Sequence, residues 1–201
     1  MTDVVFIIDR SGSMGGLESD TIGGYNSLLE KQRKSEEKIK VTTVLFDDRY
    51  ELLHNREDIE NVKPMTNEDY YVRGCTALYD AVGKTINLLK NTSSEKVLMV
   101  ITTDGMENAS REFRGNDIRK MISQQKEKGW EFLFLGANID SAETAERMGI
   151  DRSRAADYVP DGEGVAVNFE CLEAAVGDFV RYGCVKEDWS EEIRENYSKK
   201  R

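Results

Sequence analysis

The chain has 201 residues, of which 39% are apolar and 33% charged, so it is long enough and apolar enough to fold as about one domain rather than stay disordered. Acidic residues exceed basic ones by ten. This excess argues against binding to nucleic acid or to an anionic membrane surface, because both need a basic face.

The first quarter of the chain predicts a strand, a helix and a hairpin. Residues 4–8 are apolar throughout, which is typical of a strand buried on both faces. Apolar residues then recur at helical spacing over residues 17–29. Residues 40–46 and 50–54 favour two strands joined by a tight turn at residues 47–49. The hairpin predicts one antiparallel strand at an edge of the sheet.

Strands and helices alternate along the rest of the chain. Buried strands are predicted at residues 97–101 and 132–135, and a short last strand at residues 156–159. Helical stripes precede or follow these strands, and they run through Leu78, Val82, Ile86 and Leu89, through Ile118, Met121 and Ile122, and over residues 165–180. Buried strands that alternate with amphipathic helices imply parallel strands with right-handed crossovers.

The predicted fold is therefore an α/β domain with a doubly wound, mostly parallel sheet of six strands and helices on both faces. One edge strand is antiparallel. We expect residues 1–183 to form this domain. Ten of the seventeen residues from 185 to 201 are charged. This composition predicts that residues 184–201 form a solvated tail or a frayed helix.

The cysteines and the single histidine exclude several classes of site. Three scattered thiols and His54 supply neither a disulfide framework nor a zinc cluster. The first residues lack the basic region of a secretory signal, and no apolar run approaches the length of a membrane span. We expect a reduced, cytoplasmic protein that does not enter a membrane.

Oxygen-bearing side chains follow two of the buried strands. Asp9, Ser11 and Ser13 come directly after the first strand, and Asp104 follows the strand at residues 97–101. Thr76 stands at the start of the helix between them. Ligands of open α/β sheets bind beyond the carboxyl ends of strands. Because all five side chains offer oxygen and none offers sulfur or nitrogen, they suit a hard divalent cation, Mg²⁺ or Mn²⁺. Gly12 is expected to ease a sharp bend between the two serines.

This pattern resembles the metal-ion-dependent adhesion site (MIDAS) of von Willebrand factor type A domains, which are also called integrin I domains. The family pattern is D-x-S-x-S, then a distant Thr, then a distant Asp. It is matched here by Asp9, Ser11, Ser13, Thr76 and Asp104. The resemblance covers residues 3–183 and includes Leu78-Tyr79-Asp80-Ala81 and Gly136-Ala137-Asn138. Among members of the family, the chain looks more like cytoplasmic microbial proteins than secreted adhesins.

The resemblance implies a function and a role for each matched residue. In the family, the Ser and Thr hydroxyls bind the metal directly and the carboxylates often act through water. A Glu or Asp of a protein partner takes the last coordination position. The expected function is therefore metal-dependent protein binding without catalysis. The alternative is a metal-assisted phosphohydrolase. Such an enzyme requires a second Asp, as general acid, two residues after the first, and this chain has Ser11 at that position.

Several neighbouring residues have simpler interpretations. Asp, Ser and Gly are common in turns and caps, so a D-x-S-x-S string alone is a weak signal, and Thr76 would also serve as a helix cap. Turn chemistry is favoured over metal ligation for Asp47 and Asp48. Arg10 is expected to point away from the cation or to pair with an acid. Two alternatives stay open for Tyr70, Tyr71 and Arg73, which either line a partner surface or pack within their loop. Two also stay open for Glu107 and Asn108, which either bind outer-shell water or belong to a polar loop.

Overall fold

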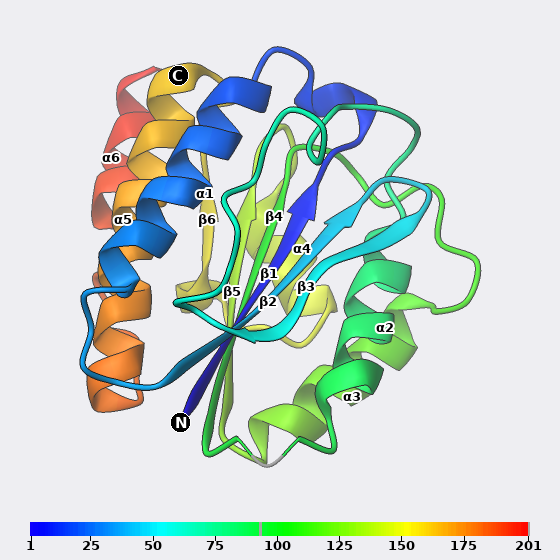
Figure 1. Ribbon diagram of the computed structural model, residues 1–201. Coiled ribbons are helices and arrows are strands. Elements are labelled where there is room, and N and C mark those ends of the chain that lie inside the picture. Colours follow the sequence, from blue (N-terminus) through cyan, green and yellow to red (C-terminus); the bar gives the residue numbers. More distant parts are fainter. Residues whose placement is uncertain (93, 201) are drawn as a thin grey trace.

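The computed structural model describes residues 1–92 and 94–200, and it contains one six-stranded sheet with the order β3-β2-β1-β4-β5-β6 (Figure 1). The hairpin strands β2 and β3 pair antiparallel, and every other neighbouring pair is parallel. The strands are β1 (Thr2–Asp9), β2 (Ile39–Phe46), β3 (Tyr50–Asp58), β4 (Lys96–Thr103), β5 (Trp130–Gly136) and β6 (Ala155–Asp157). The predicted fold class, including the antiparallel edge strand, is confirmed.

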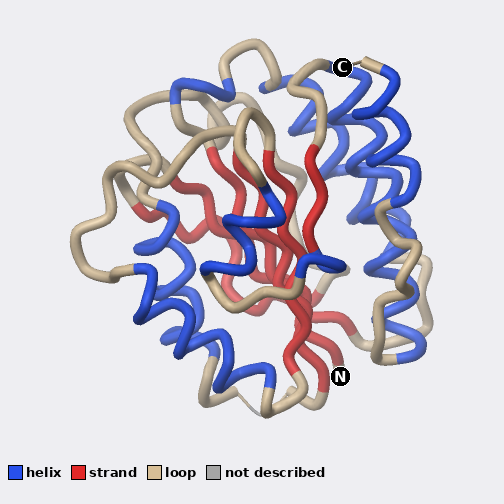
Figure 2. Tube along the Cα trace, turned by 180° about the vertical axis from the view of Figure 1, so that it is seen from behind, coloured by secondary structure: helices blue, strands red, loops and turns tan. Residues whose placement is uncertain are grey.

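Helices cover both faces of the sheet (Figures 1 and 2). One face packs against α1 (Glu18–Gln32), α5 (Gly162–Tyr182) and α6 (Glu191–Lys199). The other face packs against α2 (Leu78–Leu89), α3 (Gly115–Lys126) and α4 (Ser141–Arg147). Two short 3₁₀ helices, η1 (Gly12–Met14) and η2 (Arg152–Arg154), complete the fold.

The alternation of side chains along β1 explains why the strand is apolar throughout. Val4, Phe6 and Ile8 belong to the core under α1 and α5, whereas Val5 and Ile7 belong to the core under α2 and α3. Successive side chains of a strand point to opposite faces, so a central strand that is covered on both sides needs apolar residues at every position.

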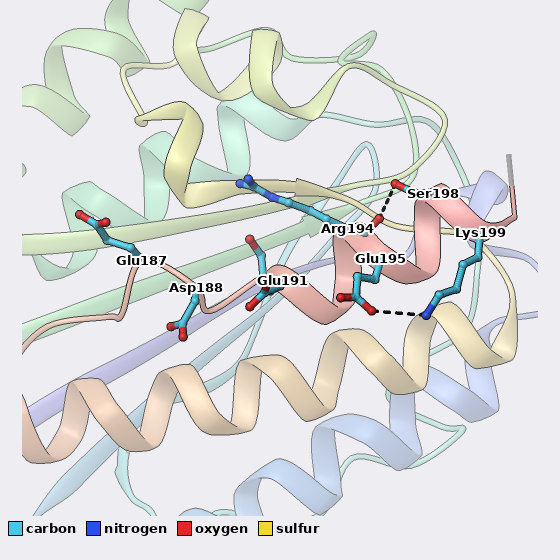
Figure 3. Close-up of a pocket in the computed structure, with 8 residues that line it drawn as sticks. Glu187, Asp188, Glu191, Arg194, Glu195, Ser198 and Lys199 are labelled. Atoms are coloured by element: carbon cyan, nitrogen blue, oxygen red, sulfur yellow. Dashed lines mark hydrogen bonds and ion pairs between the residues drawn. The ribbon is translucent and has the colours of Figure 1, made fainter.

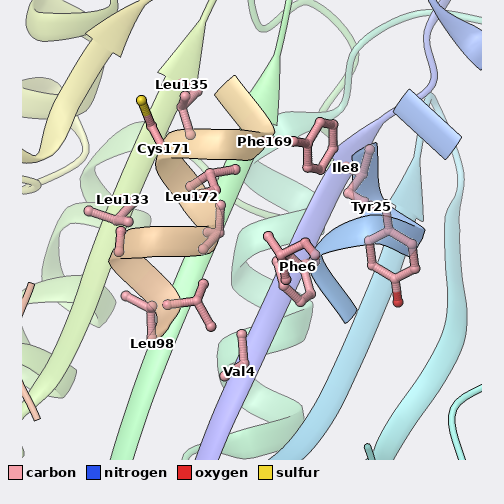
Figure 4. Packing of buried hydrophobic residues seen from close by; sticks show 14 of the residues in the cluster. Val4, Phe6, Ile8, Tyr25, Leu98, Leu133, Leu135, Phe169, Cys171 and Leu172 are labelled. Atoms are coloured by element: carbon pink, nitrogen blue, oxygen red, sulfur yellow. The ribbon is translucent and has the colours of Figure 1, made fainter. Parts of the chain in front are cut away.

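Helices α1 and α5 pack closely on each other above β1. At Gly24 of α1, an added Cβ would lie only 2.2 Å from the Phe169 ring of α5. Phe169 lies near Ile8 and Tyr25 in the same core (Figure 4). A glycine is required here because the ring occupies the space that any side chain would take.

Three differences from the sequence-based expectations concern helices. Helix α4 has only seven residues and was not predicted. Helix α5 begins at Gly162, three residues earlier than expected, because the Asp161 carboxylate accepts a hydrogen bond from the Gly164 N–H and caps the helix. The third difference lies in the C-terminal segment.

The C-terminal segment forms a docked helix. Trp189 and Ile193 are 7% and 1% exposed and belong to the core shared with α5, and the Trp189 indole donates a hydrogen bond to the Ser153 carbonyl. Trp189 in the turn before α6 and Ile193 within it thus hold the helix in place in spite of its many charged residues. The division of the chain at residue 183 stays a prediction. Of the helices in the described parts of the chain, none has both the length and the apolarity to cross a bilayer.

Candidate metal centre

Asp9 and Asp104 lie at adjacent strand ends, at the point where the sheet reverses its order. The chain runs outward from β1 through β2 to β3 and then returns to β4 on the other side of β1. Asp9 is the last residue of β1, and Asp104 directly follows β4. In open α/β sheets, a crevice for ligands forms at this reversal.

A chain of hydrogen bonds connects the three predicted hydroxyl ligands to one of the carboxylates. The Thr76 hydroxyl donates to Ser11 Oγ over 3.1 Å, and Ser11 Oγ lies 3.1 Å from Ser13 Oγ. The Ser13 hydroxyl donates to Asp104 Oδ1 over 2.5 Å. The 3₁₀ turn of η1 brings the two serines together, with the Met14 N–H bonded to the Ser11 carbonyl. Residues from three distant segments therefore converge on one point.

The Asp9 carboxylate lies next to this series of hydrogen-bonded hydroxyls and is fully buried. Its Oδ1 accepts the Ser11 N–H over 2.7 Å, and its Oδ2 accepts the Thr103 hydroxyl over 2.5 Å. Burial raises the pKa of Asp9 from 3.8 to about 6, and the nearby charge of Asp104 adds to the rise, although the bonds from Thr103 and Ser11 oppose it. Burial also raises the pKa of the second carboxylate, Asp104, although the hydrogen bond from Ser13 opposes the rise. A divalent cation would reverse both effects.

One oxygen of Asp104 is available for a ligand. Asp104 Oδ2 is buried and has no hydrogen-bond partner among the described residues. The adjacent Gly105 keeps space open, because a Cβ there would lie 3.2 Å from both Ser13 Oγ and Thr76 Oγ1. A buried carboxylate oxygen without a partner costs free energy unless something binds it.

The oxygen spacing fits an octahedral cation. Neighbouring ligands of Mg²⁺ at about 2.0–2.1 Å lie roughly 2.9 Å apart, and the steps from Thr76 to Ser11 and from Ser11 to Ser13 are both 3.1 Å. Among residues 1–92 and 94–200, no three or more His, Cys, Asp or Glu side chains gather as a metal-binding group, so a cation at this edge would depend on the three hydroxyls as well as on the two carboxylates. The residues present therefore fit a hard divalent cation at this strand edge better than a thiolate or imidazole site.

Thr76 is held by residues of the loop after β4. The Asn108 side chain accepts the Thr76 N–H, and the Thr76 carbonyl accepts the N–H groups of Asn108 and Ala109. Glu107 caps α2 by accepting the Tyr79 N–H. The sequence had suggested that Thr76 also caps the helix, but in the structure it does not. Glu107 and Asn108 have structural roles in the loop.

Two residues of the site were not predicted from sequence. Thr103 donates to Asp9, and the buried Tyr70 donates its hydroxyl to the Asp9 carbonyl over 2.6 Å. The sequence did contain a signal for Thr103, because it is a polar residue at the end of a largely apolar strand. Tyr70 is buried in the core on the α1 side of the sheet and lines no surface, whereas Tyr71 is 44% exposed. The explanation given for Gly12 was wrong, since its φ is not positive and a Cβ would meet its nearest neighbour at an ordinary 3.6 Å.

The expectation that Arg10 would pair with an acid is confirmed. Arg10 is fully buried, and its guanidinium forms ion pairs with Asp47 and Glu51. Asp47 does accept the Arg49 N–H, as a turn residue would. It also accepts hydrogen bonds from Arg10 and Arg73. Although burial opposes it, the hydrogen bonds from the Arg73 side chain and the Arg49 N–H hold the pKa of Asp47 below its usual value.

The chain also has an open hollow of about 730 Å³ that is lined by α6 and by the turn before it (Figure 3). Charged side chains line it, and the Lys199 ammonium pairs with Glu195 there. These side chains face solvent and pair along the helix, so they have the character of a hydrated surface rather than of a built site.

The family model of the von Willebrand factor type A domain matches residues 3–167. No curated protein matches the chain at a significant level. Among solved structures, the fold is similar to the von Willebrand factor domain of the type V pilus tip protein Mfa5 from Porphyromonas gingivalis. The TM-score is 0.65 at 12% identity, over 92% of this chain and 98% of that one.

Two further structures share the fold at low identity. The pilus adhesin SpaC from Lactobacillus rhamnosus GG, in an open conformation, gives a TM-score of 0.69 at 13% identity over 90% of this chain and 30% of SpaC. Proximal thread matrix protein 1 from the mussel byssus, with a zinc-occupied MIDAS motif, gives 0.60 at 15% identity over 91% of this chain. This chain spans less than half of the mussel protein, 46% of its length. The match of the family model over most of the sequence, on a sheet of the same architecture, shows that this chain belongs to the von Willebrand factor type A domain family.

Proposed function

We propose that this protein is a metal-dependent protein-binding module. In this proposal Asp9, Ser11, Ser13, Thr76 and Asp104 hold a divalent cation at the carboxyl edge of the sheet, and the cation binds an Asp or Glu of a partner protein. The observation that carries the proposal is the buried Asp104 Oδ2, which has no hydrogen-bond partner in the described part of the protein and lies at the end of a series of three hydrogen-bonded hydroxyls.

The hydroxyls and the Asp9 carboxylate would have different roles in binding the cation. The hydroxyls of Ser11, Ser13 and Thr76 offer lone pairs once their protons turn away from each other. Asp9 accepts hydrogen bonds at both oxygens from Ser11 and Thr103, so it would act mainly by its charge and through the groups it orients. The bound cation would supply a Lewis-acidic position for an incoming carboxylate.

Charge explains why the partner should be acidic. The two carboxylates of the site carry two negative charges, which a 2+ cation neutralises. An incoming carboxylate then meets a site with no net negative charge and an exchangeable coordination position. We propose Mg²⁺ or Mn²⁺ as the physiological ion because the ligands are all oxygen. The zinc in the mussel protein supports metal binding at a MIDAS motif of this family but does not identify the metal here.

We propose binding rather than catalysis for this site. Ser11 stands where a phosphatase of the doubly wound type would need a general acid, and its hydroxyl belongs to the hydrogen-bonded chain. The similar structures reported above are a pilus tip protein, a pilus adhesin and a thread matrix protein, which agrees with a binding role. The net charge of −10 disfavours nucleic acid and anionic membranes as partners. The cytoplasmic location stays a prediction, and the pilus proteins among the similar structures do not support it.

The test uses peptides selected for binding to the full chain in Mg²⁺. We expect selected peptides to contain an Asp or Glu, to lose binding when that residue becomes Asn or Gln, and to lose binding in EDTA. The Asp104→Asn variant should bind neither Mn²⁺ nor the peptides.

Asp3→Asn is the matched control, since Asp3 is a buried aspartate at the opposite end of β1. It should keep both activities. Peptide binding that persists in EDTA, or that survives Asp104→Asn, would contradict capture through a metal.

A further inference from the structure

A network of charged side chains connects the serine loop to the loop that carries Thr76. Arg10 lies between Asp9 and Ser11 in sequence but is 0% exposed. Its Nε donates to Asp47 over 3.2 Å, its Nη1 to the Asp69 carbonyl over 3.1 Å, and its Nη2 to Glu51 over 2.5 Å. A buried guanidinium with its donors shared among three acceptors has one defined orientation.

The same aspartate binds the second loop. Asp47 Oδ2 accepts the Arg73 Nε over 2.6 Å, and the Asp47 carbonyl accepts the Ala77 N–H over 2.9 Å. Ala77 directly follows Thr76, so Asp47 contacts this loop on both sides of the predicted ligand.

Backbone hydrogen bonds complete the connection. The Arg73 N–H donates to the Arg10 carbonyl over 2.9 Å, and the Gly12 N–H donates to the Gly74 carbonyl over 3.2 Å. Gly74 has a φ of +64°, in the left-handed region where glycine is favoured. The turn before Thr76 thus depends on contacts with the serine loop, and Arg73 is the only residue of residues 70–75 whose side chain forms a described ion pair.

We propose that Arg73 is a positioning residue of the metal site and acts through Asp47. It holds Thr76 at the distance from Ser11 at which both hydroxyls contact one divalent cation. Groups that orient metal ligands commonly change metal affinity by about 10–100-fold when they are removed. The inference rests on the proposed metal site, but it concerns metal affinity and needs no partner protein.

The chain offers a closely matched control at the other end of the sheet. Arg56 pairs with the buried Asp3 over 3.1 Å and its side chain is 27% exposed, whereas Arg73 pairs with the buried Asp47 and is 31% exposed. Asp3 and Asp9 are separated by about 20 Å along β1. Each arginine therefore neutralises a buried aspartate, but only Arg73 adjoins the metal site.

The experiment measures Mn²⁺ affinity by electron paramagnetic resonance, and thermal unfolding in EDTA, for the wild type and for Arg73→Ala, Arg73→Lys and Arg56→Ala. We expect Arg73→Ala to weaken Mn²⁺ binding by about 10-fold or more. Arg73→Lys should recover part of the loss, because an ammonium keeps the charge opposite Asp47 without the guanidinium geometry. Arg56→Ala should lower thermal stability and leave Mn²⁺ affinity unchanged.

The outcomes separate this inference from the proposed function. If the wild type binds Mn²⁺ and both arginine-to-alanine variants keep its affinity while losing stability, Arg73 is merely structural and the positioning role is overturned. If Arg73→Ala does not fold, Arg73→Lys decides, and wild-type affinity in that variant overturns the role. A wild type that binds no Mn²⁺ overturns the proposed function and this inference together.

Discussion

The buried Asp9 carboxylate should make the metal-free protein more stable as pH falls from 7 to 5. Burial raises the pKa of Asp9 from 3.8 to about 6, so the folded state binds this proton more tightly than the unfolded chain does. A carboxyl group with a raised pKa contributes stability that is complete below its unfolded value and is lost as pH rises through its folded value.

The magnitude follows from the shift. About two pKa units correspond to ~3 kcal/mol of unfolding free energy between the protonated and ionised limits. Most of that change lies between pH 4 and pH 6, so the step from pH 7 to pH 5 recovers about 1 kcal/mol. For a chain of this length, this equals roughly 2–4 °C in Tm. Asp104, whose pKa is also raised by burial, acts in the same direction.

The assay is urea unfolding in EDTA at pH 5, 6 and 7, on the wild type and Asp9→Asn. The comparison with Asp9→Asn is needed because lowering the pH also reduces the general repulsion of an acidic chain. The wild type should gain about 1 kcal/mol more than the variant. With saturating Mg²⁺, the extra gain should vanish, since the cation keeps the carboxylates ionised. Equal pH dependence in both proteins would refute the assignment of a costly buried charge to Asp9.

Three further predictions test the packing around the site and the C-terminal helix. Thr103→Val removes the hydrogen bond to Asp9 Oδ2; we expect weaker Mn²⁺ binding by titration and a loss of about 1–3 kcal/mol in urea unfolding. Ile193→Ala, at a position 1% exposed, should cost about 2–5 kcal/mol in the same assay, whereas an unchanged stability would mean that α6 does not dock. Gly24→Ala forces a methyl group against the Phe169 ring and should lower stability by about 1–3 kcal/mol, measured by calorimetry.

The hydrophobic pattern of the sequence was sufficient to predict the sheet. Apolar runs at residues 4–8, 97–101 and 132–135 have no polar positions, and their shortness and their content of Val, Ile and Phe favour strands buried on both faces. The turn at residues 47–49 was sufficient to predict the antiparallel edge. The order of the metal pattern along the chain also indicated which strand ends must meet, because parallel strands present their carboxyl ends at one edge.

The firm docking of α6 could not be predicted in this way. The charged composition of residues 185–201 suggested a solvated tail or a frayed helix with at most loose docking of its few apolar residues, but Trp189 and Ile193 bury their side chains against α5 and β6. Two apolar contacts outweigh many charges, because the charges remain in water at little cost. Such a contact depends on a neighbouring surface that local sequence does not describe.

The residue types and their order alone determined the α/β fold and the five oxygen ligands proposed for a cation, since burial on both faces and hard-ligand chemistry are properties of the side chains themselves. Only the tertiary structure decided how those ligands are supported. Thr103 beneath Asp9, Asn108 beside Thr76, and Asp47 between two guanidiniums are all separated in sequence from the residues they orient. Hydrogen bonds across such separations depend on how strands and loops pack, and no local pattern records that.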